Sequence, residues 1–222
     1  MNSKKQSINP VSVIIPTYNR PKLTLQAVRS VLLQSEPPDE VIVVDDGSTN
    51  ETRRMLESFG DQIMFIYQDN RGVAAARNHG IRKSANDRVA FLDSDDLWTV
   101  DKLALQRRAL QSNPDYKICY TGEHWLRHGK SVNARKQRSK YNGWIYRQCL
   151  AACIVAASSV LVHKSVFDKV GLFDENLPAC EDYELWLRIA LHYPFLYLPH
   201  PCILKQLGRW PSLSQQYGLD QH

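Results

Sequence analysis

The chain has 222 residues, of which 43% are hydrophobic and 23% charged, and its formal net charge is +5. This is the composition of an ordinary globular protein, long enough for one domain or a closely packed pair with a substantial core. The five cysteines form an odd set without CxxC spacing, which argues against both a disulfide framework and a zinc site. The mild positive charge does not by itself indicate nucleic-acid binding, and we predict no nucleic-acid partner.

No segment predicts export or membrane insertion. Residues 1–10 are predicted to form a flexible tail, which is polar and lacks the apolar stretch of a secretory signal. The longest apolar run, Leu150–Val162, is shorter than the roughly 20 residues that a membrane helix needs. Together with the cysteine pattern, these features predict a soluble, cytoplasmic protein.

Strand-like and helix-like segments alternate in the first half. Apolar runs rich in β-branched residues predict strands at Val11–Ile15, Val41–Val44 and Val89–Leu92, with a weaker strand at Ile63–Tyr67. Helical spacing predicts helices at Lys22–Leu33 and Val73–Ile81, and a capping box of Ser48 and Glu51 predicts a further helix just after residue 47. This alternation predicts an α/β fold with right-handed crossovers and a mostly parallel central sheet flanked by helices.

The second half is less regular. Its predicted elements are helices at Asp101–Gln111, Lys164–Val170 and Tyr183–His192 and strands at Lys117–Tyr120 and Ala156–His163. Segment 127–140 holds six Lys or Arg and no acid, which predicts a loop, and segment 205–222 is predicted to be irregular and polar. Because no long linker interrupts the chain, we predict a single domain over residues 11–222.

Polar clusters follow three of the predicted strands, at residues 16–20, 45–48 and 93–96. The carboxyl ends of parallel strands meet at one edge of a sheet, so these clusters are expected to converge on a ligand site. The sequence lacks GxGxxG and GxxxxGK[ST], the glycine-rich phosphate loops. The carboxylates of Asp93–Asp96 would repel one another unless a hard cation such as Mg or Mn relieved the repulsion. Such a cation could bridge to a diphosphate, as in a nucleotide sugar.

Five segments resemble, in order, the motifs of family 2 glycosyltransferases, which have the GT-A fold. These segments are residues 11–20 (VSVIIPTYNR), 43–48 (VVDDGS), 70–80 (NRGVAAARNHG), 91–98 (FLDSDDLW) and 181–188 (EDYELWLR). The resemblance runs from about Val11 to about Leu213, nearly the whole chain. It implies a Rossmann-like nucleotide-sugar-binding half at residues 11–98 and an acceptor-binding half at residues 99–222.

The resemblance also implies a donor site. Its members are expected to bind a nucleotide-sugar donor, most often with uracil as the base: Pro16, Thr17, Tyr18, Arg20, Asp46, Arg77, Asp93, Ser94 and Asp95. Tyr18 would stack on the base, the backbone of Pro16 and Thr17 would touch it, and Asp46 would hydrogen-bond it. Asp93-Ser94-Asp95 matches the DxD motif of the family, in which Asp95 and Asp93 would hold Mn or Mg, Asp95 as the ligand and Asp93 also in contact with the ribose or sugar.

Asp182 matches the catalytic base of the family, which takes the proton of the acceptor hydroxyl in a single inverting displacement. Independently of the family, a carboxylate near a helix N-terminus can stay ionised and accept a proton. Glu181, beside it, is a candidate acceptor or lid residue. The alternative is that Glu181 and Asp182 only cap their helix. Arg209 and Trp210 lie in a segment that resembles the closing loop of the family, so they would act as a lid, or else they are exposed loop residues.

These expectations converge on an inverting, metal-dependent glycosyltransferase that moves a sugar from a nucleotide diphosphate sugar to an acceptor hydroxyl. We expect the donor to be UDP-linked and the acceptor to be a saccharide or lipid-linked, in cell-surface polysaccharide or glycolipid assembly. The basic segment 127–140 either contacts anionic lipid at the inner face of the membrane or is a solvated loop. Three alternatives stay open: a sugar nucleotidyltransferase, a non-catalytic nucleotide-sugar-binding module, and a basic interaction protein that works through segment 127–140.

Overall fold

The computed structural model describes residues 9–127, 130–132 and 139–207. Its strands are β1 (Val11–Thr17), β2 (Glu40–Asp46), β3 (Met64–Gln68), β4 (Arg88–Phe91), β5 (Asp96–Trp98), β6 (Ile118–Arg127), β7 (Lys130–Ser131), β8 (Val160–His163) and β9 (Phe195–Leu207). Its α-helices are α1 (Pro21–Leu32), α2 (Thr52–Leu56), α3 (Val73–Lys83), α4 (Lys102–Ser112), α5 (Tyr146–Ala151), α6 (Ser165–Val170) and α7 (Glu181–Ala190). Two 3-10 helices, η1 (Glu57–Gln62) and η3 (Ala157–Ser159), complete the set.

One sheet runs through the molecule in the order β3-β2-β1-β4-β8-β6-β9-β5, with β7 paired to β6. The pairs among β1, β2, β3 and β4 are parallel, as the alternation of strands and helices predicted. Antiparallel pairing then attaches β8 to β4 and β6, and β5 to β9, so strands from both halves of the chain share the sheet. The predicted α/β fold is confirmed.

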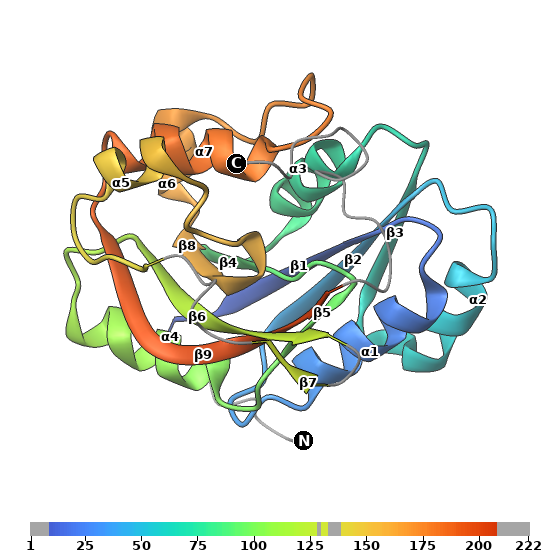
Figure 1. Cartoon of the computed structure of the whole chain (residues 1–222). Coiled ribbons are helices and arrows are strands. Elements are labelled where there is room, and N and C mark those ends of the chain that lie inside the picture. Colours follow the sequence, from blue (N-terminus) through green and yellow to red (C-terminus); the bar gives the residue numbers. More distant parts are fainter. Residues whose placement is uncertain (1–8, 128–129, 133–138, 208–222) are drawn as a thin grey trace.

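Helices cover both faces of this sheet (Figure 1). Helices α3, α5, α6 and α7 lie over one face, and α1, α2 and α4 lie over the other. Side chains of β1 alternate between the two cores, since Ile14 packs in the core under α3 and α7 while Val13 and Ile15 pack in the core with α1 and α4. A Cβ added at Gly80 would lie 2.5 Å from Cγ2 of Ile14, so glycine lets α3 approach β1 closely.

The predicted capping box is wrong. Helix α2 begins at Thr52, and Oδ1 of Asn50 accepts hydrogen bonds from the backbone N of Thr52 at 3.0 Å and from its Oγ1 at 2.6 Å. The Ser48 hydroxyl instead accepts a hydrogen bond from the backbone N of Asn19 at 2.8 Å. Because Ser48 is used in this tertiary contact, it is not available to cap the helix.

The prediction of an irregular segment from residue 205 is also wrong at its start, because residues 205–207 end β9. Strand β9 pairs in parallel with β6 and antiparallel with β5. The predicted strand 156–163 is a strand only from Val160, since η3 occupies residues 157–159. Within the described ranges, no helix is both long and apolar enough to cross a membrane.

Candidate active site

The three polar clusters meet at the carboxyl edge of the parallel strands, as predicted. Loop 18–20 after β1 contacts the loop after β2, where Oδ1 of Asn19 accepts a hydrogen bond from the backbone N of Thr49 at 2.9 Å. Arg20 then reaches the cluster after β4, where its Nη1 donates to Oδ2 of Asp95 at 2.8 Å. Parallel pairing of β1 with β2 and β4 places all three loops side by side, so the tertiary structure brings residues 18–20, 45–49 and 93–96 into one site.

The acidic cluster after β4 is held by Ser158 of η3. Oγ of Ser158 accepts a hydrogen bond from the backbone N of Asp93 at 3.1 Å and donates one to Oδ2 of Asp96 at 2.7 Å. Asp96 is buried, and burial raises the pKa of its carboxyl to about 7, with the charge of Lys205 opposing this shift and those of Asp93 and Asp95 adding to it. Asp96 is therefore a buried structural carboxyl of the site, while Asp93 and Asp95 keep side chains about one third exposed, at 32% and 35%.

Arg77 of α3 joins this cluster to the start of α7. The side chain is 4% exposed, and its guanidinium donates from Nη2 to Oδ1 of Asp93 at 2.6 Å and from Nη1 to Oε1 of Glu181. Burial opposes the charge on Arg77, but Asp93, Glu181 and Asp182 outweigh burial and raise its pKa. Arg77 in turn overcomes the burial of Asp93 and holds the pKa of that carboxyl below its usual value. Arg77, a predicted donor residue, thus joins Asp93 to Glu181, the neighbour of the predicted base Asp182.

Asp182 lies in the first turn of α7, immediately after Glu181. Its Oδ1 accepts a hydrogen bond from the backbone N of Tyr183 at 2.7 Å. Burial and the charge of Glu181 raise the pKa of the Asp182 carboxyl to about 6, against the opposing charge of Arg77. A carboxylate with a pKa just below neutral is mostly ionised at pH 7 and is a better proton acceptor than an ordinary aspartate. Its electrostatics therefore suit a general base.

Cys180, which precedes α7, has φ of +62° in the left-handed region, where non-glycine residues are uncommon. Such backbone conformations persist only where surrounding contacts hold them, and they occur often at functional sites. Here the conformation directs the chain into the first turn of α7, which presents Glu181 and Asp182 to the site.

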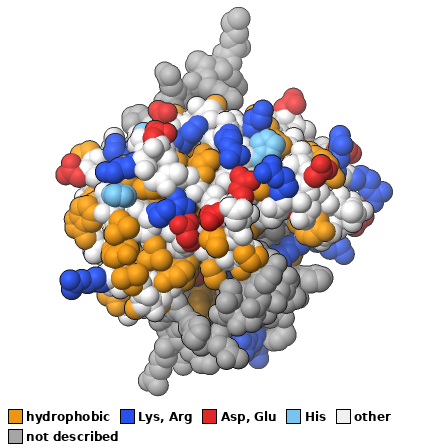
Figure 2. Space-filling view, turned by 90° about the horizontal axis from the view of Figure 1, so that it is seen from above, with side chains coloured by type: hydrophobic (Ala, Val, Ile, Leu, Met, Phe, Trp, Pro, Cys, Tyr) orange, Lys and Arg blue, Asp and Glu red, His pale blue; other side chains and the backbone are white. Residues whose placement is uncertain are grey.

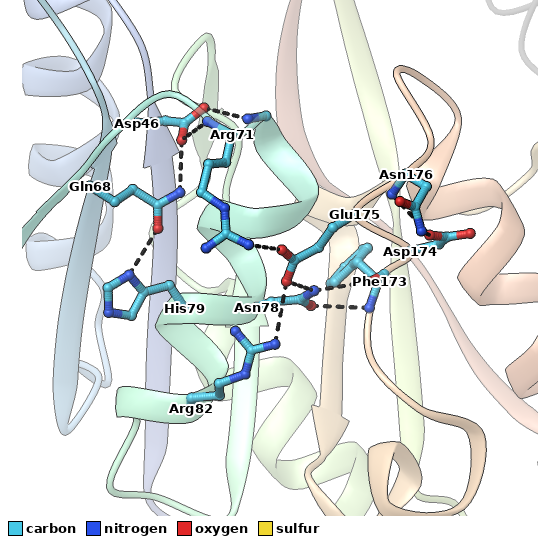
Figure 3. A network of polar contacts seen from close by, with 11 residues as sticks. Asp46, Gln68, Arg71, Asn78, His79, Arg82, Phe173, Asp174, Glu175 and Asn176 are labelled. Carbon is cyan, nitrogen blue, oxygen red and sulfur yellow. Dashed lines mark hydrogen bonds and ion pairs between the residues drawn. The ribbon is translucent and has the colours of Figure 1, made fainter.

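Asp46 at the end of β2 holds the loop that leads into α3 (Figure 3). Its Oδ1 accepts hydrogen bonds from Nε2 of Gln68 at 2.7 Å and from the backbone N of Arg71 at 3.0 Å, and its Oδ2 accepts one from the backbone N of Gly72 at 2.8 Å. Gly72 has φ of +91°, which only glycine adopts readily. The Asp46 side chain is buried, and because a carboxylate has about four acceptor positions, these three hydrogen bonds leave one acceptor position on Oδ2. The loop-holding role was not visible in the sequence.

The other predicted donor residues have different degrees of access. Tyr18 is 47% exposed, so its ring is open to a ligand. The side chain of Thr17 is buried and bonded to the hydroxyl of Thr24 at 2.6 Å, which leaves only its backbone for a ligand. Pro16 is buried beside Val44 in the parallel pair of β1 and β2. Ser94 is buried at 6% exposure. The predicted contacts of these residues with a base or sugar stay predictions.

Lys205 is a site residue that the sequence reading missed. It stands on β9 opposite Asp96 of β5 in the antiparallel register. Burial disfavours its charge, but Asp96, Glu123 and Asp93 overcome burial, with a smaller effect of Asp182, and raise its pKa. The only sequence signal was a basic residue that follows the apolar run 202–204, and this signal requires knowing that β9 extends through residue 207.

The carboxylates of the site fit a hard divalent cation that takes only one or two ligands from the protein. Across the described ranges, no three His, Cys, Asp or Glu side chains gather closely enough to hold a metal by themselves. Asp93 and Asp95 stand at the exposed edge, and Arg77 and Arg20 each engage one oxygen of these carboxylates. Mg-type ions are commonly bound by one or two carboxylates, with phosphate oxygens and waters completing the shell. The residues thus suit a cation that arrives with a diphosphate.

Two other predictions concern segments that the structure describes in part or not at all. In the basic segment, Arg127 ends β6 and Lys130 begins β7, whereas residues 128–129 and 133–138 lie outside the described ranges. Lys140 is not solvated, since its Nζ donates to Oε1 of Glu123 at 2.7 Å and to the carbonyl of Ile154 at 2.6 Å. The predicted lid residues Arg209 and Trp210 lie outside the described residues.

The chain is similar to known glycosyltransferases. The model of glycosyl transferase family 2 matches residues 12–170. A protein of Rickettsia conorii described as an uncharacterized glycosyltransferase is 33% identical over 190 residues, which cover 84% of this chain and 31% of that protein. A chondroitin synthase of Escherichia coli is 27% identical over 197 residues, which cover 86% of this chain and 28% of that protein. The chain therefore spans less than a third of the length of these two relatives.

Solved structures share the fold. Staphylococcus aureus TarS, residues 1–349, in complex with UDP-GlcNAc, superposes with a TM-score of 0.75 at 20% identity, covering 92% of this chain and 60% of that one. The mannosyltransferase PcManGT of Pyrobaculum calidifontis, in complex with GDP-Man and Mn²⁺, superposes with a TM-score of 0.70 at 24% identity, covering 90% and 58%. The fold is that of GT-A transferases, and with the family model matching well over half of its residues, the chain belongs to glycosyltransferase family 2.

Proposed function

We propose that this chain transfers a sugar from a nucleoside diphosphate sugar to an acceptor hydroxyl with inversion at the anomeric carbon. The observation that carries this proposal is the contact of Arg77 with both Asp93 and Glu181, which brings the DxD motif and the residue beside Asp182 to the same guanidinium. A donor-binding carboxylate pair and a candidate base thus share one site. The family membership of the chain supports the same reaction.

The donor would bind across the carboxyl edge of β1, β2 and β4. The exposed ring of Tyr18 would stack on the base, and Asp46 would accept a hydrogen bond from it with its remaining acceptor position. We propose uracil as the base, in line with the family resemblance. TarS and PcManGT, two proteins that share the fold, bind a uridine and a guanosine donor respectively, so both nucleotides belong in a binding test.

The diphosphate would lie beside Asp93 and Asp95, together with Mn²⁺ or Mg²⁺. When bound, the cation supplies positive charge that stabilises the leaving diphosphate. Of the residues of the chain, Asp95 and Asp93 would hold the cation, while Arg20 and Lys205 add fixed positive charge at the same edge. Charges that are already in place where negative charge develops lower the barrier without rearrangement.

Asp182 would act as the catalytic base. The acceptor oxygen forms a bond to the anomeric carbon while the bond from that carbon to the diphosphate oxygen breaks. The proton of the acceptor hydroxyl passes to the Asp182 carboxylate, and the bonding electron pair leaves with the nucleoside diphosphate. Because the attack and the departure are in line and occur once, the configuration inverts. The raised pKa of Asp182, about 6, makes its carboxylate a better proton acceptor at neutral pH than an ordinary aspartate.

Nucleotide titration tests the donor and metal parts of this proposal. UDP and GDP are titrated by calorimetry with and without Mn²⁺, in the parent and in Asp95→Ala. We expect at least one nucleotide to bind more tightly with Mn²⁺, and Asp95→Ala to lose about tenfold or more of the Mn²⁺-dependent affinity, equivalent to about 1.4 kcal/mol. Asp61→Ala, which removes an exposed carboxylate on η1, is the matched control and should bind like the parent. Equal Mn²⁺-dependent affinity of Asp95→Ala and the parent would refute the metal assignment.

The acceptor is proposed to be a saccharide or a lipid-linked saccharide in surface polysaccharide or glycolipid assembly. The chondroitin synthase among the similar proteins supports the first class. For the second class, the basic segment 127–140 would approach the anionic inner face of a membrane, where each well-placed charge contributes about 1 kcal/mol. Arg127 and Lys130 are exposed on β6 and β7 and are therefore available for this contact.

Vesicle binding tests the membrane contact. Replacing Arg127 and Lys130 together with glutamine should lower association with phosphatidylglycerol vesicles by about tenfold or more, measured by co-sedimentation at low salt. The control is Lys22→Gln with Lys83→Gln, which removes two exposed charges elsewhere and should leave association unchanged. Equal losses in both double variants would mean that net charge alone matters, and unchanged binding in both would show that Arg127 and Lys130 make no membrane contact.

A further inference from the structure

A network of polar contacts joins the loop held by Asp46 to the segment that precedes α7 (Figure 3). The backbone N of Arg71 donates to Asp46 at 3.0 Å, and Nη2 of the same residue donates to Oε2 of Glu175 at 2.7 Å. The backbone of Arg71 thus contacts Asp46, where the nucleobase is proposed to bind, and its side chain contacts segment 171–180. Asp46 and Glu175 are far apart in the sequence, and Arg71 bridges them directly.

The far end of the network is anchored in the core. Asn78 of α3 is 1% exposed, and its Nδ2 donates to the carbonyl of Phe173 and to Oε1 of Glu175, both at 2.9 Å. The backbone N of Phe173 donates back to Oδ1 of Asn78 at 3.0 Å. The Phe173 ring packs edge-on against Trp186, with 6.3 Å between centroids, one helical turn after Asp182 on α7. Segment 173–175 is therefore in contact with both α3 and the helix that carries Asp182.

The end of the network at Arg71 is exposed and adjustable. The side chains of Arg71 and Arg82 are 64% and 56% exposed, whereas that of Glu175 is 24% exposed. Figure 2, which views this layer of the molecule from above, shows basic and acidic side chains lying among one another over the centre of the face. Exposed ion pairs contribute little stability and rearrange easily, so the Arg71 contact can respond to the loop while the Asn78 contacts stay fixed.

Glu175 is ionised in this arrangement. Its hydrogen bond from Asn78 is the largest cause that lowers its pKa, burial opposes this effect, and Arg82 and Arg71 lower the pKa further. Arg82 donates to Oε1 of Glu175 at 3.3 Å and lies near the end of α3, whereas the Arg71 contact is on Oε2. Oε1 of Glu175 is therefore bonded to Asn78 and Arg82 of α3, and Oε2 is bonded to Arg71 of the loop that Asp46 holds.

We propose that the ion pair of Arg71 and Glu175 couples nucleobase binding at Asp46 to segment 171–180, which leads into the helix that carries Asp182. This inference rests on the proposed function, since it needs a nucleotide at Asp46. A bound base restrains loop 69–72, which favours the Arg71 conformation that reaches Glu175, and Glu175 then restrains segment 171–180. A ligand can shift a conformation only by binding one state better than another. The difference here is in the contacts of Asp46 with the backbone N of Arg71 and Gly72, which hold loop 69–72. Glu175 is a positioning residue, because it touches no reacting atom.

Amide hydrogen exchange tests this coupling without knowledge of the acceptor. Exchange is measured with and without saturating UDP or GDP, with Mn²⁺, in the parent, in Arg71→Met and in Arg82→Met. In the parent, we expect nucleotide to slow exchange of residues 173–182 by about fivefold or more, the lower range of measured couplings between sites. Arg71→Met keeps the backbone contact with Asp46 but loses the bridge, so most of this slowing should disappear at full occupancy. Arg82→Met also removes an exposed arginine from Glu175 but leaves the bridge, so the slowing should persist.

The nucleotide-induced difference, rather than exchange without ligand, is the deciding quantity, because a merely structural role of Arg71 would change both states equally. Glu175→Gln should behave like Arg71→Met. Nucleotide binding without slowing at residues 173–182, or slowing that survives in Arg71→Met, would overturn the coupling and leave the proposed function standing. Equal loss in Arg71→Met and Arg82→Met would also overturn it, since the bridge would not be the cause. Failure of both UDP and GDP to bind would overturn the proposed function together with the coupling.

Discussion

Asp182→Asn should lower the rate of sugar transfer by about a hundredfold to ten-thousandfold, the range that a positioned general base contributes. Asparagine has nearly the same size and keeps an oxygen for the backbone N of Tyr183, but it cannot accept the acceptor proton. Nucleotide affinity measured by calorimetry should stay close to that of the parent. The measurement is a donor-turnover assay with the nucleotide sugar that the binding test selects.

The control for this variant is Asp168→Asn, which changes an exposed aspartate on α6 and should leave turnover unchanged. Full activity of Asp182→Asn would contradict the assignment and favour the interpretation that Asp182 only caps α7. The loss of nucleotide binding together with turnover would instead show that the variant disturbs the donor site.

The pH profile of the parent gives a second readout of Asp182. Burial and the neighbouring Glu181 raise its pKa to about 6, and the base must be deprotonated to work. The value of kcat/KM is therefore expected to be constant near pH 7 and to fall as the pH drops through about 6, whereas an unperturbed aspartate would place this limb near pH 4.

Arg77→Met should be the most destabilising single change in the site. It removes the buried partner that bonds both Asp93 and Glu181, and leaves the Glu181 carboxylate, which is buried, without its hydrogen-bonded counter-ion. Breaking a buried ion pair on one side costs about 3–5 kcal/mol. For a chain of this size, this corresponds to a Tm lower by about 10 °C, measured by calorimetry or circular dichroism.

The matched control is Arg54→Met, which breaks an ion pair with Glu51 in which the arginine is 78% exposed. Exposed pairs contribute at most about 1 kcal/mol, so its Tm should stay within a few degrees of the parent. Adding Glu181→Gln to Arg77→Met should recover part of the loss, because it removes one of the unpaired charges. Equal Tm values of Arg77→Met and Arg54→Met would contradict the assigned role.

The effect of Arg77→Met should also depend on pH in a defined direction. Arg77 holds the pKa of Asp93 below its usual value in the folded protein, so this ion pair stabilises the fold above the unfolded pKa of about 4. The stabilisation is lost as the pH falls through the folded pKa. The difference in Tm between the parent and the variant is therefore expected to be largest at neutral pH and to shrink below about pH 4.

The pattern of apolar and polar residues along the chain was enough to locate the strands and loops of the donor half. Strands β1, β2 and β4 are buried on both faces, so their apolar runs are uninterrupted, and the polar residues that end each run mark the carboxyl edge. The convergence of residues 16–20, 45–48 and 93–96 followed from parallel pairing alone. Family-like motifs then singled out Asp95 and Asp182 for roles that stay predictions.

Contacts between distant segments decided what the pattern left open. The sequence predicts that Ser48 caps a helix, but its hydroxyl accepts a hydrogen bond from the backbone N of Asn19. The family resemblance predicts that Asp46 contacts a ligand, and in the structure Asp46 also holds loop 69–72. The sequence predicts an irregular segment at Lys205, but this residue lies on β9 and is paired with Asp96 of β5. In each case a polar side chain had more than one partner available, and only the folded chain determined which one was near.

The sequence by itself therefore determined the strands and helices of the donor half and the edge at which the site lies, because these depend on hydrophobic period and strand direction, whereas the roles expected of its acidic residues came from the family-like motifs. The tertiary structure alone decided that Arg77 joins Asp93 to Glu181, that Arg71 reaches Glu175, and that the pKa of Asp182 is raised. These properties depend on burial and on distances between residues up to 104 positions apart, which local patterns do not encode.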